Sequence, residues 1–101
     1  MKAYLQDFHK AFENRIRLGI MSTLMANSTI EFNALKELLQ VTDGNLASHL
    51  KALEKEKFIE TKKTFIGRKP NTRYKATRAG RKAFEAHLAA IEQLIKDQQK
   101  G

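Results

Sequence analysis

Residues 45–57, NLASHLKALEKEK, carry the most regular helical pattern in the chain, and a β-type pattern begins directly behind them. Three leucines recur at intervals of four and three residues, on one helical face: Leu46, Leu50 and Leu53. The preceding VTDG is typical of a turn, and Thr42 or Asp43 is expected to cap the helix by accepting from its free first-turn amides. The chain therefore has to place a capped amphipathic helix immediately beside β structure.

Two runs rich in β-branched and aromatic residues, FIETKKTF and TRYKAT, predict a β-hairpin. Between them IGRKPN contains Gly67 and Pro70, and it predicts a loop too long for a tight two-residue turn. Phe65 and Tyr74 are expected in the hairpin core.

Helices are also expected on the N-terminal side of this unit. In residues 3–28 apolar side chains recur every three or four positions, which indicates one helix or two helices meeting near Asn14, a plausible N-cap. Gly19 costs about 1 kcal/mol relative to alanine inside a helix, so another helix is expected to pack closely there. A strand stub, TIEF, precedes a helix over 33–40 with Asn33 as its cap. Its inward residues are expected to be Leu35, Leu38 and Leu39.

A last helix is expected to begin after a cap at Thr77. Its apolar stripe consists of Phe84, Leu88, Ile91, Leu94 and Ile95. The order is helix, helix, short strand, helix, turn, helix, two-stranded hairpin, helix. This order predicts a mainly α (α+β) fold in one domain, without internal repeats.

Composition narrows the class of partner. At 101 residues the chain is a small single domain, and a net charge of +8 points to nucleic acid or an anionic membrane surface. No apolar run approaches the roughly 18 residues of a spanning helix, and no signal peptide is recognisable. The absence of cysteine excludes disulfides and thiolate metal sites. A cytoplasmic location is the expectation.

The positive charge is concentrated in residues 62–82, which hold nine of the 19 lysines and arginines and no acid. A solvated hairpin normally mixes charge signs, but the following cations have no acid in the local sequence: Lys62, Lys63, Arg68, Lys69, Arg73, Lys75 and Arg78. Arg68 and Lys69 stand at the tip beside Pro70, where a narrow minor groove would attract cations. The mutual repulsion predicts a polyanionic partner.

Two short helices joined by a turn and followed at once by a hairpin predict a winged helix-turn-helix with a two-stranded β wing. In that arrangement the second helix lies in the major groove, and the wing reaches the adjacent backbone or minor groove. Opposite the leucines lie small and polar residues: Gly44, Asn45, Ser48, Lys51, Ala52 and Lys55. Asn45 and Ser48 can bond base edges, and the lysines can reach phosphates. The helix alone would equally suit an ordinary solvated surface, but the basic wing beside it favours nucleic acid.

The segments TDGNLASHLKALEKEKFIE and RYKATRAGRKAF carry a family resemblance. They look like a recognition helix that runs into a wing, and like a second wing strand, a T-x-x-G corner and the start of a last helix. Over about residues 12–85 the chain resembles winged-helix transcriptional regulators of the MarR/ArsR-like group, especially the compact subgroup that is little more than a DNA-binding domain.

The resemblance implies a homodimer on a pseudo-palindromic operator, with base contacts near Asn45, Ser48 and His49 and wing contacts near Arg68, Lys69 and Arg73. We therefore expect a homodimeric repressor in a prokaryotic cytoplasm, nucleoid-associated when bound. The full expected DNA-binding set is Thr42, Gly44, Asn45, Ser48, His49, Lys51, Lys55, Lys63, Arg68, Lys69, Arg73 and Lys75.

Metal-sensing members of the group use cysteine or clustered histidines and carboxylates. Here His9, His49 and His87 are scattered, so no metal or cofactor is expected. Larger members hold ligands between the DNA-binding lobe and long dimerisation helices, for which this chain has little room.

Apolar faces outside the helix-turn-helix support dimerisation, because a chain this short cannot bury them all in one core. We expect residues 1–13 and 78–100 to form dimerisation helices around a helix-turn-helix at 33–57 and a wing at 58–77. The proposed dimer residues are Leu5, Phe8, Phe12, Phe84, Leu88, Ile91 and Ile95. The alternative is that the two terminal helices pack on each other within one subunit.

Other functions find less support. The acids are spread along helices, Glu54, Glu56 and Glu60 among them as solvated or i,i+4 partners, and no phosphate loop or nucleophile motif occurs, so an enzyme is not expected. A protein-interaction or RNA-binding module without operator specificity stays open. RNA binding is disfavoured because Phe65 and Tyr74 are expected inside the hairpin rather than as a stacking platform.

Overall fold

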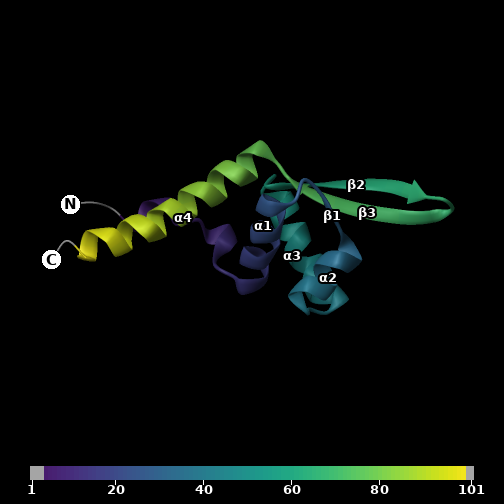
Figure 1. The fold of residues 1–101 in the computed structure, drawn as a ribbon, viewed down its shortest axis with the longest axis horizontal. Helices are drawn as coiled ribbons and strands as arrows, with labels where there is room; N and C mark the ends of the chain where they lie inside the picture. Colours follow the sequence, from purple (N-terminus) through teal and green to yellow (C-terminus); the bar gives the residue numbers. More distant parts are fainter. Residues whose placement is uncertain (1–3, 100–101) are drawn as a thin grey trace.

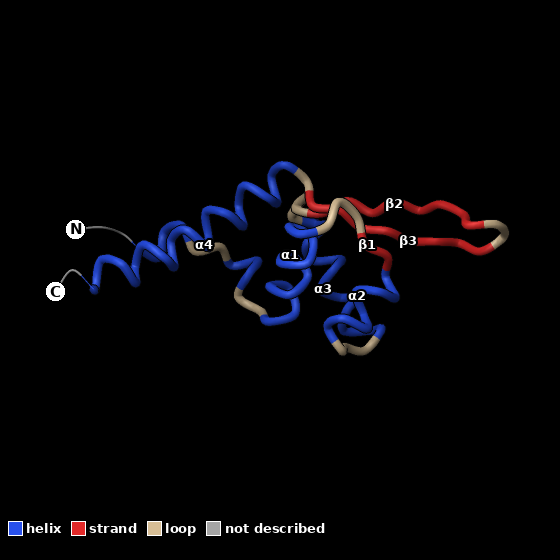
Figure 2. Tube along the Cα trace, viewed as in Figure 1, coloured by secondary structure: helices blue, strands red, loops and turns tan. Residues whose placement is uncertain are grey.

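The computed structural model describes residues 4–99. They form four α-helices and a three-stranded antiparallel sheet in an elongated molecule of 60 × 25 × 21 Å. The strands extend from one end as an arm, and the long last helix occupies the other end (Figures 1 and 2). This confirms the mainly helical winged fold. The elements are α1 (Arg15–Ala26), β1 (Ile30–Glu31), α2 (Phe32–Leu39), α3 (Asp43–Lys55), β2 (Ile59–Ile66), β3 (Lys69–Ala76) and α4 (Arg78–Gln99).

The segment before α1 is not the α-helix expected for residues 1–13. Its described part forms two short 3-10 helices, Tyr4–Asp7 and Lys10–Phe12, and residues 1–3 lie outside the described part. The backbone of Asn14 is extended, and its Oδ1 accepts hydrogen bonds from the amides of Ile16 at 2.9 Å and Arg17 at 3.1 Å. Asn14 is therefore the N-cap of α1. The sequence allowed either one continuous helix or a break near Asn14, and the break is correct.

The helix-turn-helix is formed by α2 and α3. The Thr42 hydroxyl accepts from the Asn45 amide at 3.1 Å, so of the two expected caps, Thr42 and Asp43, Thr42 is the correct one. Asn33 does not cap α2, because that helix begins at Phe32, directly behind β1. Leu38 was also wrongly expected inside: its side chain is 63% exposed, since the eight-residue helix buries only a narrow stripe around Leu35.

The core lies where α3 crosses α1 and meets the base of the sheet. Its buried residues include Ile20, Met21, Leu24, Leu35, Leu46, Leu50, Leu53 and Ile59. Gly19 faces α2 as expected from its place in a helix: a Cβ there would lie 2.9 Å from a methyl of Leu39. Small size at this position lets the two helices approach closely.

The sheet has the order β1-β3-β2, and the long hairpin of β2 and β3 forms the wing. Ile66 pairs with Lys69, so only Gly67 and Arg68 connect the strands. The expected long loop is wrong. Gly67 is the first loop residue and has a φ of 64°, which suits a tight type II′ turn. Pro70 fits within β3 because β1 pairs only with the base of that strand and leaves its outer edge open.

A tight corner joins the wing to α4. The Thr77 amide donates to the Phe58 carbonyl at 2.9 Å, and the Thr77 hydroxyl donates to the Lys57 carbonyl at 2.7 Å. The same hydroxyl accepts from the Gly80 amide at 2.9 Å, which confirms Thr77 as the cap of α4. A Cβ at Gly80 would lie 2.0 Å from the Phe58 carbonyl oxygen, so only glycine fits.

The N-terminal segment packs along α4 within the same subunit. The Tyr4 hydroxyl donates to Asp97 at 2.7 Å, and the Phe8 ring contacts His87 edge-on at 5.5 Å. Phe12 and Phe84 contact each other in the core and are buried, so neither can offer surface to a second subunit. Phe8 is half-buried, and the other four members of the expected dimer set are exposed: Leu5, Leu88, Ile91 and Ile95.

Candidate nucleic-acid interface

The outer face of α3 is open to solvent. The side chains expected to meet DNA from this helix are exposed, and they are Asn45, Ser48, Lys51 and Lys55. Ala52 is half-buried, and together with Ser48, Lys51, Glu54 and Lys55 it lines a shallow open hollow. This face presents small polar groups and two ammonium groups, which are chemically suited to base edges and phosphates.

The start of α3 is fixed by contacts around the turn. Asp43 forms an ion pair with Lys36 of α2 at 2.8 Å, and Gln40 reverses the chain with a φ of 52°. Thr42 uses its hydroxyl oxygen as the helix cap, while Gly44 is exposed with nothing near its Cβ position. These contacts define where α3 begins and how it follows α2.

His49 lies on the flank of the outer face of α3. It is half-buried, and burial, followed by the positive charge of Arg17 on α1, lowers the pKa of its imidazole. The Arg17 Nε is itself buried, and among residues 4–99 it has no hydrogen-bond partner. His49 therefore lies one helical turn after Asn45, on the side of α3 that is nearer to Arg17.

Glu54 connects α3 to the wing, a role not apparent from the sequence, where Glu54 reads as a solvated helix residue. Its carboxylate accepts a hydrogen bond from the Thr61 hydroxyl of β2. Burial, followed by the charge of Glu54, raises the pKa of the nearby Tyr74 phenol. Thr61 and Tyr74 are directly opposed in the sheet, so this face of the wing is the one that looks toward α3.

The register divides the predicted wing residues between two faces, since side chains alternate along a strand. Lys63 and Phe65 follow Thr61 on the α3-facing side. The other face carries Lys62, Ile66, Lys69, Arg73 and Lys75. Arg68 lies in the turn. The predicted cations are therefore not one continuous row.

Two of these cations belong to the body of the sheet. Arg73 is half-buried, its Nε donates to Thr29 at 3.0 Å, and β1 places Glu31 directly opposite it. Lys75 is half-buried opposite Glu60. The local sequence shows no acid beside Arg73, but β1 is distant in sequence and its pairing places Glu31 opposite Arg73. Arg68 and Lys69 are exposed at the tip.

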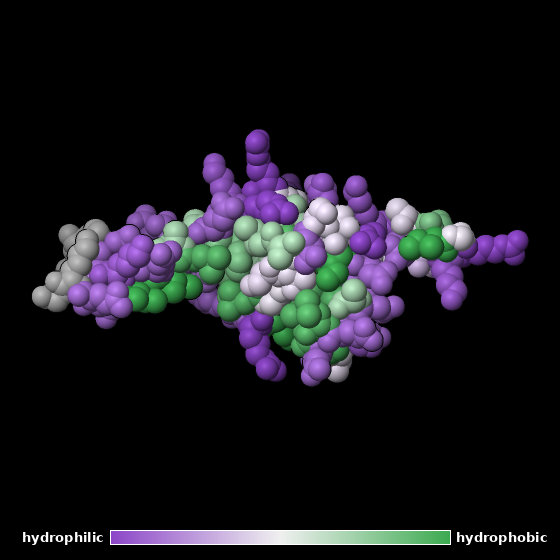
Figure 3. Space-filling model, in the orientation of Figure 1, coloured by the Kyte–Doolittle hydropathy of each residue, from purple (hydrophilic) through white to green (hydrophobic). Residues whose placement is uncertain are grey.

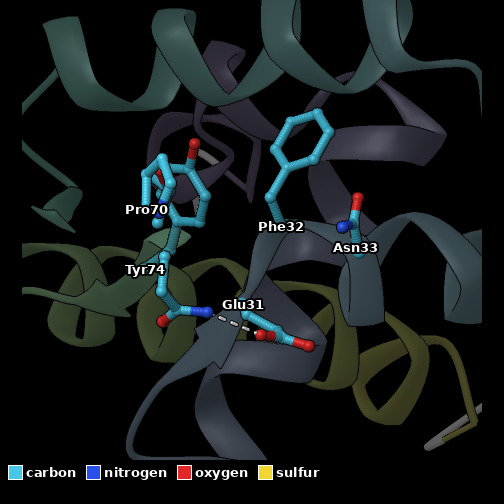
Figure 4. A pocket seen from close by; sticks show the side chains of 7 residues that line it. Glu31, Phe32, Asn33, Pro70 and Tyr74 are labelled. Atoms are coloured by element: carbon cyan, nitrogen blue, oxygen red, sulfur yellow. Dashed lines mark hydrogen bonds between the residues drawn. The ribbon is translucent and has the colours of Figure 1, made fainter. Parts of the chain in front are cut away.

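The outer half of the wing is also tied to the residue that precedes α2. Asn71 Nδ2 donates to Glu31 at 2.8 Å, beside a hollow of about 250 Å³. Figure 4 shows this bond, with the rings of Phe32 and Tyr74 turned the same way. Asn71 Oδ1 is buried without a partner in the described structure. These contacts restrict how the hairpin can swing relative to the helix-turn-helix.

Two features are absent from residues 4–99, the part of the chain that the structure describes. None of the helices in that range is long and apolar enough to span a bilayer. The same residues contain no group of three or more histidines and carboxylates placed to hold a metal ion.

Comparison with known proteins agrees with this geometry. Residues 16–95 match the family described as winged helix DNA-binding domain. An uncharacterized protein of Methanocaldococcus jannaschii is 44% identical over 88 residues, which cover 87% of this chain and 96% of that protein.

Solved structures give the same picture. A transcriptional regulator homologue from Pyrococcus horikoshii superposes with a TM-score of 0.86 at 28% identity, covering 96% of this chain and 98% of the other. The YusO protein of Bacillus subtilis shares the fold with a TM-score of 0.80 at 17% identity, over 94% of this chain and 67% of the other.

Proposed function

Because this chain belongs to the winged helix DNA-binding domain family, we propose that it is a transcriptional regulator that binds specific sequences of double-stranded DNA. The observation that carries the proposal is the outer face of α3, where Asn45 and Ser48 are exposed between a rigid N-cap and the wing. In the proposed complex α3 lies in the major groove and the wing tip reaches the neighbouring backbone or minor groove.

Each expected contact takes a distinct role in this proposal. Asn45 and Ser48 read base edges, and Gly44 allows close approach of the first turn. Lys51, Lys55 and Lys63 neutralise phosphates, as do the tip residues Arg68 and Lys69. Four residues of the expected DNA-binding set are half-buried or already bonded within the protein, and they contribute indirectly by holding the surface in place: Thr42, His49, Arg73 and Lys75.

We also propose that the regulator is a homodimer joined through α4. Leu88, Ile91 and Ile95 form an exposed stripe beside the buried positions of the same helix, and Leu5 lies exposed in the segment that packs along it. Covering this area with a second copy removes apolar surface from water. Two recognition helices related by a two-fold axis would suit half-sites about 34 Å apart on a pseudo-palindromic operator.

The proposed sign of regulation is based on the DNA that a bound dimer would cover. A dimer seated on two successive major grooves excludes other proteins from the same DNA, so we propose that the regulator is a repressor. In this scheme residues 33–57 form the DNA-reading unit, 58–77 the wing, and 78–100 with the N-terminal segment the dimerisation region.

The test is selection of bound fragments from random duplex DNA, followed by a salt titration on the selected sequence. The proposal requires a recurring motif and a steep, linear fall of log K with log salt. Binding that shows no motif, or binding that prefers single-stranded RNA, would instead favour the alternative of a protein-interaction or RNA-binding module.

A further inference from the structure

We propose that the wing tip is an apolar wedge that enters the minor groove, partly unstacks a base step and bends the DNA. This inference rests on the proposed function and adds a deformation of the duplex to it. It concerns Phe65 and Ile66, which have no role in the proposed contacts with phosphates and base edges.

The tip exposes large apolar side chains that the fold leaves uncovered. Phe65 is 73% exposed and Ile66 is 65% exposed, and Pro70, the strand partner of Phe65, is exposed as well. Figure 3 shows an isolated hydrophobic (green) group near the end of the arm, bordered by hydrophilic (purple) side chains. The expectation that Phe65 lies in the hairpin core is therefore wrong. The hairpin extends beyond the helices, so no core remains at that distance to receive the ring.

The charges around this apolar group indicate which kind of partner the wing tip binds. Lys63, Arg68 and Lys69 are exposed around it, and residues 61–78 contain no aspartate or glutamate. A partner that is anionic outside and apolar within matches this pattern, and duplex DNA offers phosphates at the groove rim and stacked bases behind them. Minor-groove proteins insert phenylalanine, isoleucine and proline between base steps in this way.

The reach of the wing agrees with this placement. Thr61 is anchored to Glu54 of α3, and Ile66 lies five residues further along β2, or about 17 Å at the rise of an extended strand. Successive major and minor grooves are separated by half of a 34 Å turn, again about 17 Å. With α3 in the major groove, the apolar tip therefore arrives at the next minor groove.

The wing is also held firmly enough to deform DNA. Its two-residue turn leaves no slack at the tip, and partway along β3 the Asn71–Glu31 hydrogen bond ties the hairpin to the residue that precedes α2. A loose loop would yield to the stacked bases, whereas a hairpin that is closed by a tight turn and tied to the helix-turn-helix can press a side chain between them.

The experiment uses a short A·T-rich duplex with 2-aminopurine at one TA step, the step type that kinks easily. A donor and an acceptor dye at its two ends report bending. The intact protein is expected to raise 2-aminopurine fluorescence and to shorten the dye-to-dye distance. Phe65→Ala is expected to lose most of both signals while its affinity falls by no more than about tenfold, since the variant also avoids the cost of unstacking.

Two variants serve as controls. Phe65→Leu keeps an apolar side chain and is expected to retain part of both signals. Leu38→Ala removes an equally exposed apolar side chain from α2 and is expected to behave as the unmodified protein. Because Phe65 and Leu38 are both largely exposed, thermal melting is expected to show folded variants.

Unstacking that is the same with Phe65→Ala as with the intact protein overturns the wedge and leaves the proposed function standing. Failure of the intact protein to bind any duplex overturns both. Phe65-dependent binding to vesicles of phosphatidylserine and phosphatidylcholine, without any 2-aminopurine signal on DNA, assigns the tip to a lipid surface and also overturns the wedge.

Discussion

The Glu54 carboxylate of α3 accepts a hydrogen bond from the Thr61 hydroxyl of β2, so the proposed recognition helix and the wing are joined by a direct side-chain contact. The contact places a negative charge on the surface that would face DNA phosphates. Glu54 therefore helps to hold the wing against α3, but its negative charge would repel DNA. A substitution can remove the charge and keep the hydrogen bond.

Glu54→Gln is expected to strengthen binding to duplex DNA by roughly fivefold, because it removes the repulsion while the amide oxygen still accepts from Thr61. Fluorescence anisotropy at two salt concentrations measures the gain, which should shrink at the higher one. The pKa of Tyr74 should fall only in part, because burial is the larger cause of its rise. Weaker binding by this variant would contradict the proposed orientation of α3.

Asn45→Ala and Arg68→Ala should weaken binding in different ways. Loss of Asn45 is expected to relax discrimination between the selected sequence and its single-base variants by about 1–3 kcal/mol. Loss of Arg68 should weaken binding to all duplexes alike and reduce the salt slope by about 1. Competition binding with a panel of duplexes distinguishes the two. If Asn45→Ala keeps full sequence preference, the recognition face has been misplaced.

Gly80→Ala is expected to lower the free energy of unfolding by about 3 kcal/mol or more, because the new Cβ would overlap the Phe58 carbonyl. Urea denaturation measures the loss. Gly44→Ala is the matched control: nothing lies near its Cβ position, so stability should hold or rise by up to about 1 kcal/mol. Equal stability of the two variants would refute the tight corner.

Acidification is expected to destabilise the fold through His87. Burial, followed by the charge of His9 and opposed by Glu13, lowers the pKa of His87 below its ordinary 6.5. The unfolded chain therefore takes up a proton more readily than the folded one, and the free energy of unfolding falls as the pH drops below 6.5. Protonation of Nδ1 would also remove the acceptor for the His9 amide, which lies 3.1 Å away.

The measurement for this prediction is urea unfolding at pH values above and below 6.5. His87→Phe should flatten the dependence without abolishing it, since the pKa of His49 is lowered as well. An unchanged pH dependence in His87→Phe would show that His87 does not cause the loss.

The double variant Leu88→Lys, Ile95→Lys is expected to be a folded monomer with reduced affinity for the selected operator, because both side chains are exposed in one subunit. Sedimentation velocity reports the mass, and Leu38→Lys serves as the control on α2. A monomeric unmodified protein at the concentrations that saturate DNA would refute the dimer.

Local signals predicted most of the helical fold. The caps at Asn14 and Thr77 were predicted correctly, and Thr42 was one of the two candidates for α3, because a cap depends on a side chain and the amides two or three residues later. Asn33 failed as a cap because β1 pairs with β3 and the chain enters α2 directly from that strand. That pairing joins residues more than forty positions apart, and no local pattern contains it.

The wing was predicted as a hairpin but not in its detail. Gly67 and Pro70 are equally compatible with a long loop and with a tight turn, and the choice depends on backbone dihedral angles and register. The same uncertainty concealed the exposure of Phe65, since β-branched and aromatic residues indicate a strand without showing how far it projects. The candidate face of α3 was easier to predict, because three buried leucines determine which side faces outward.

The corner at Thr77 and Gly80 has a consequence for signalling. The corner is held by three hydrogen bonds, and Gly80 packs directly against the Phe58 carbonyl. The hairpin and α4 are therefore joined without a hinge. In a pair of subunits joined along α4, a rotation at that contact would swing each arm as a rigid lever. A change of about a degree near the two-fold axis would then be magnified into a displacement at the far tip, some tens of ångströms away in a molecule 60 Å long.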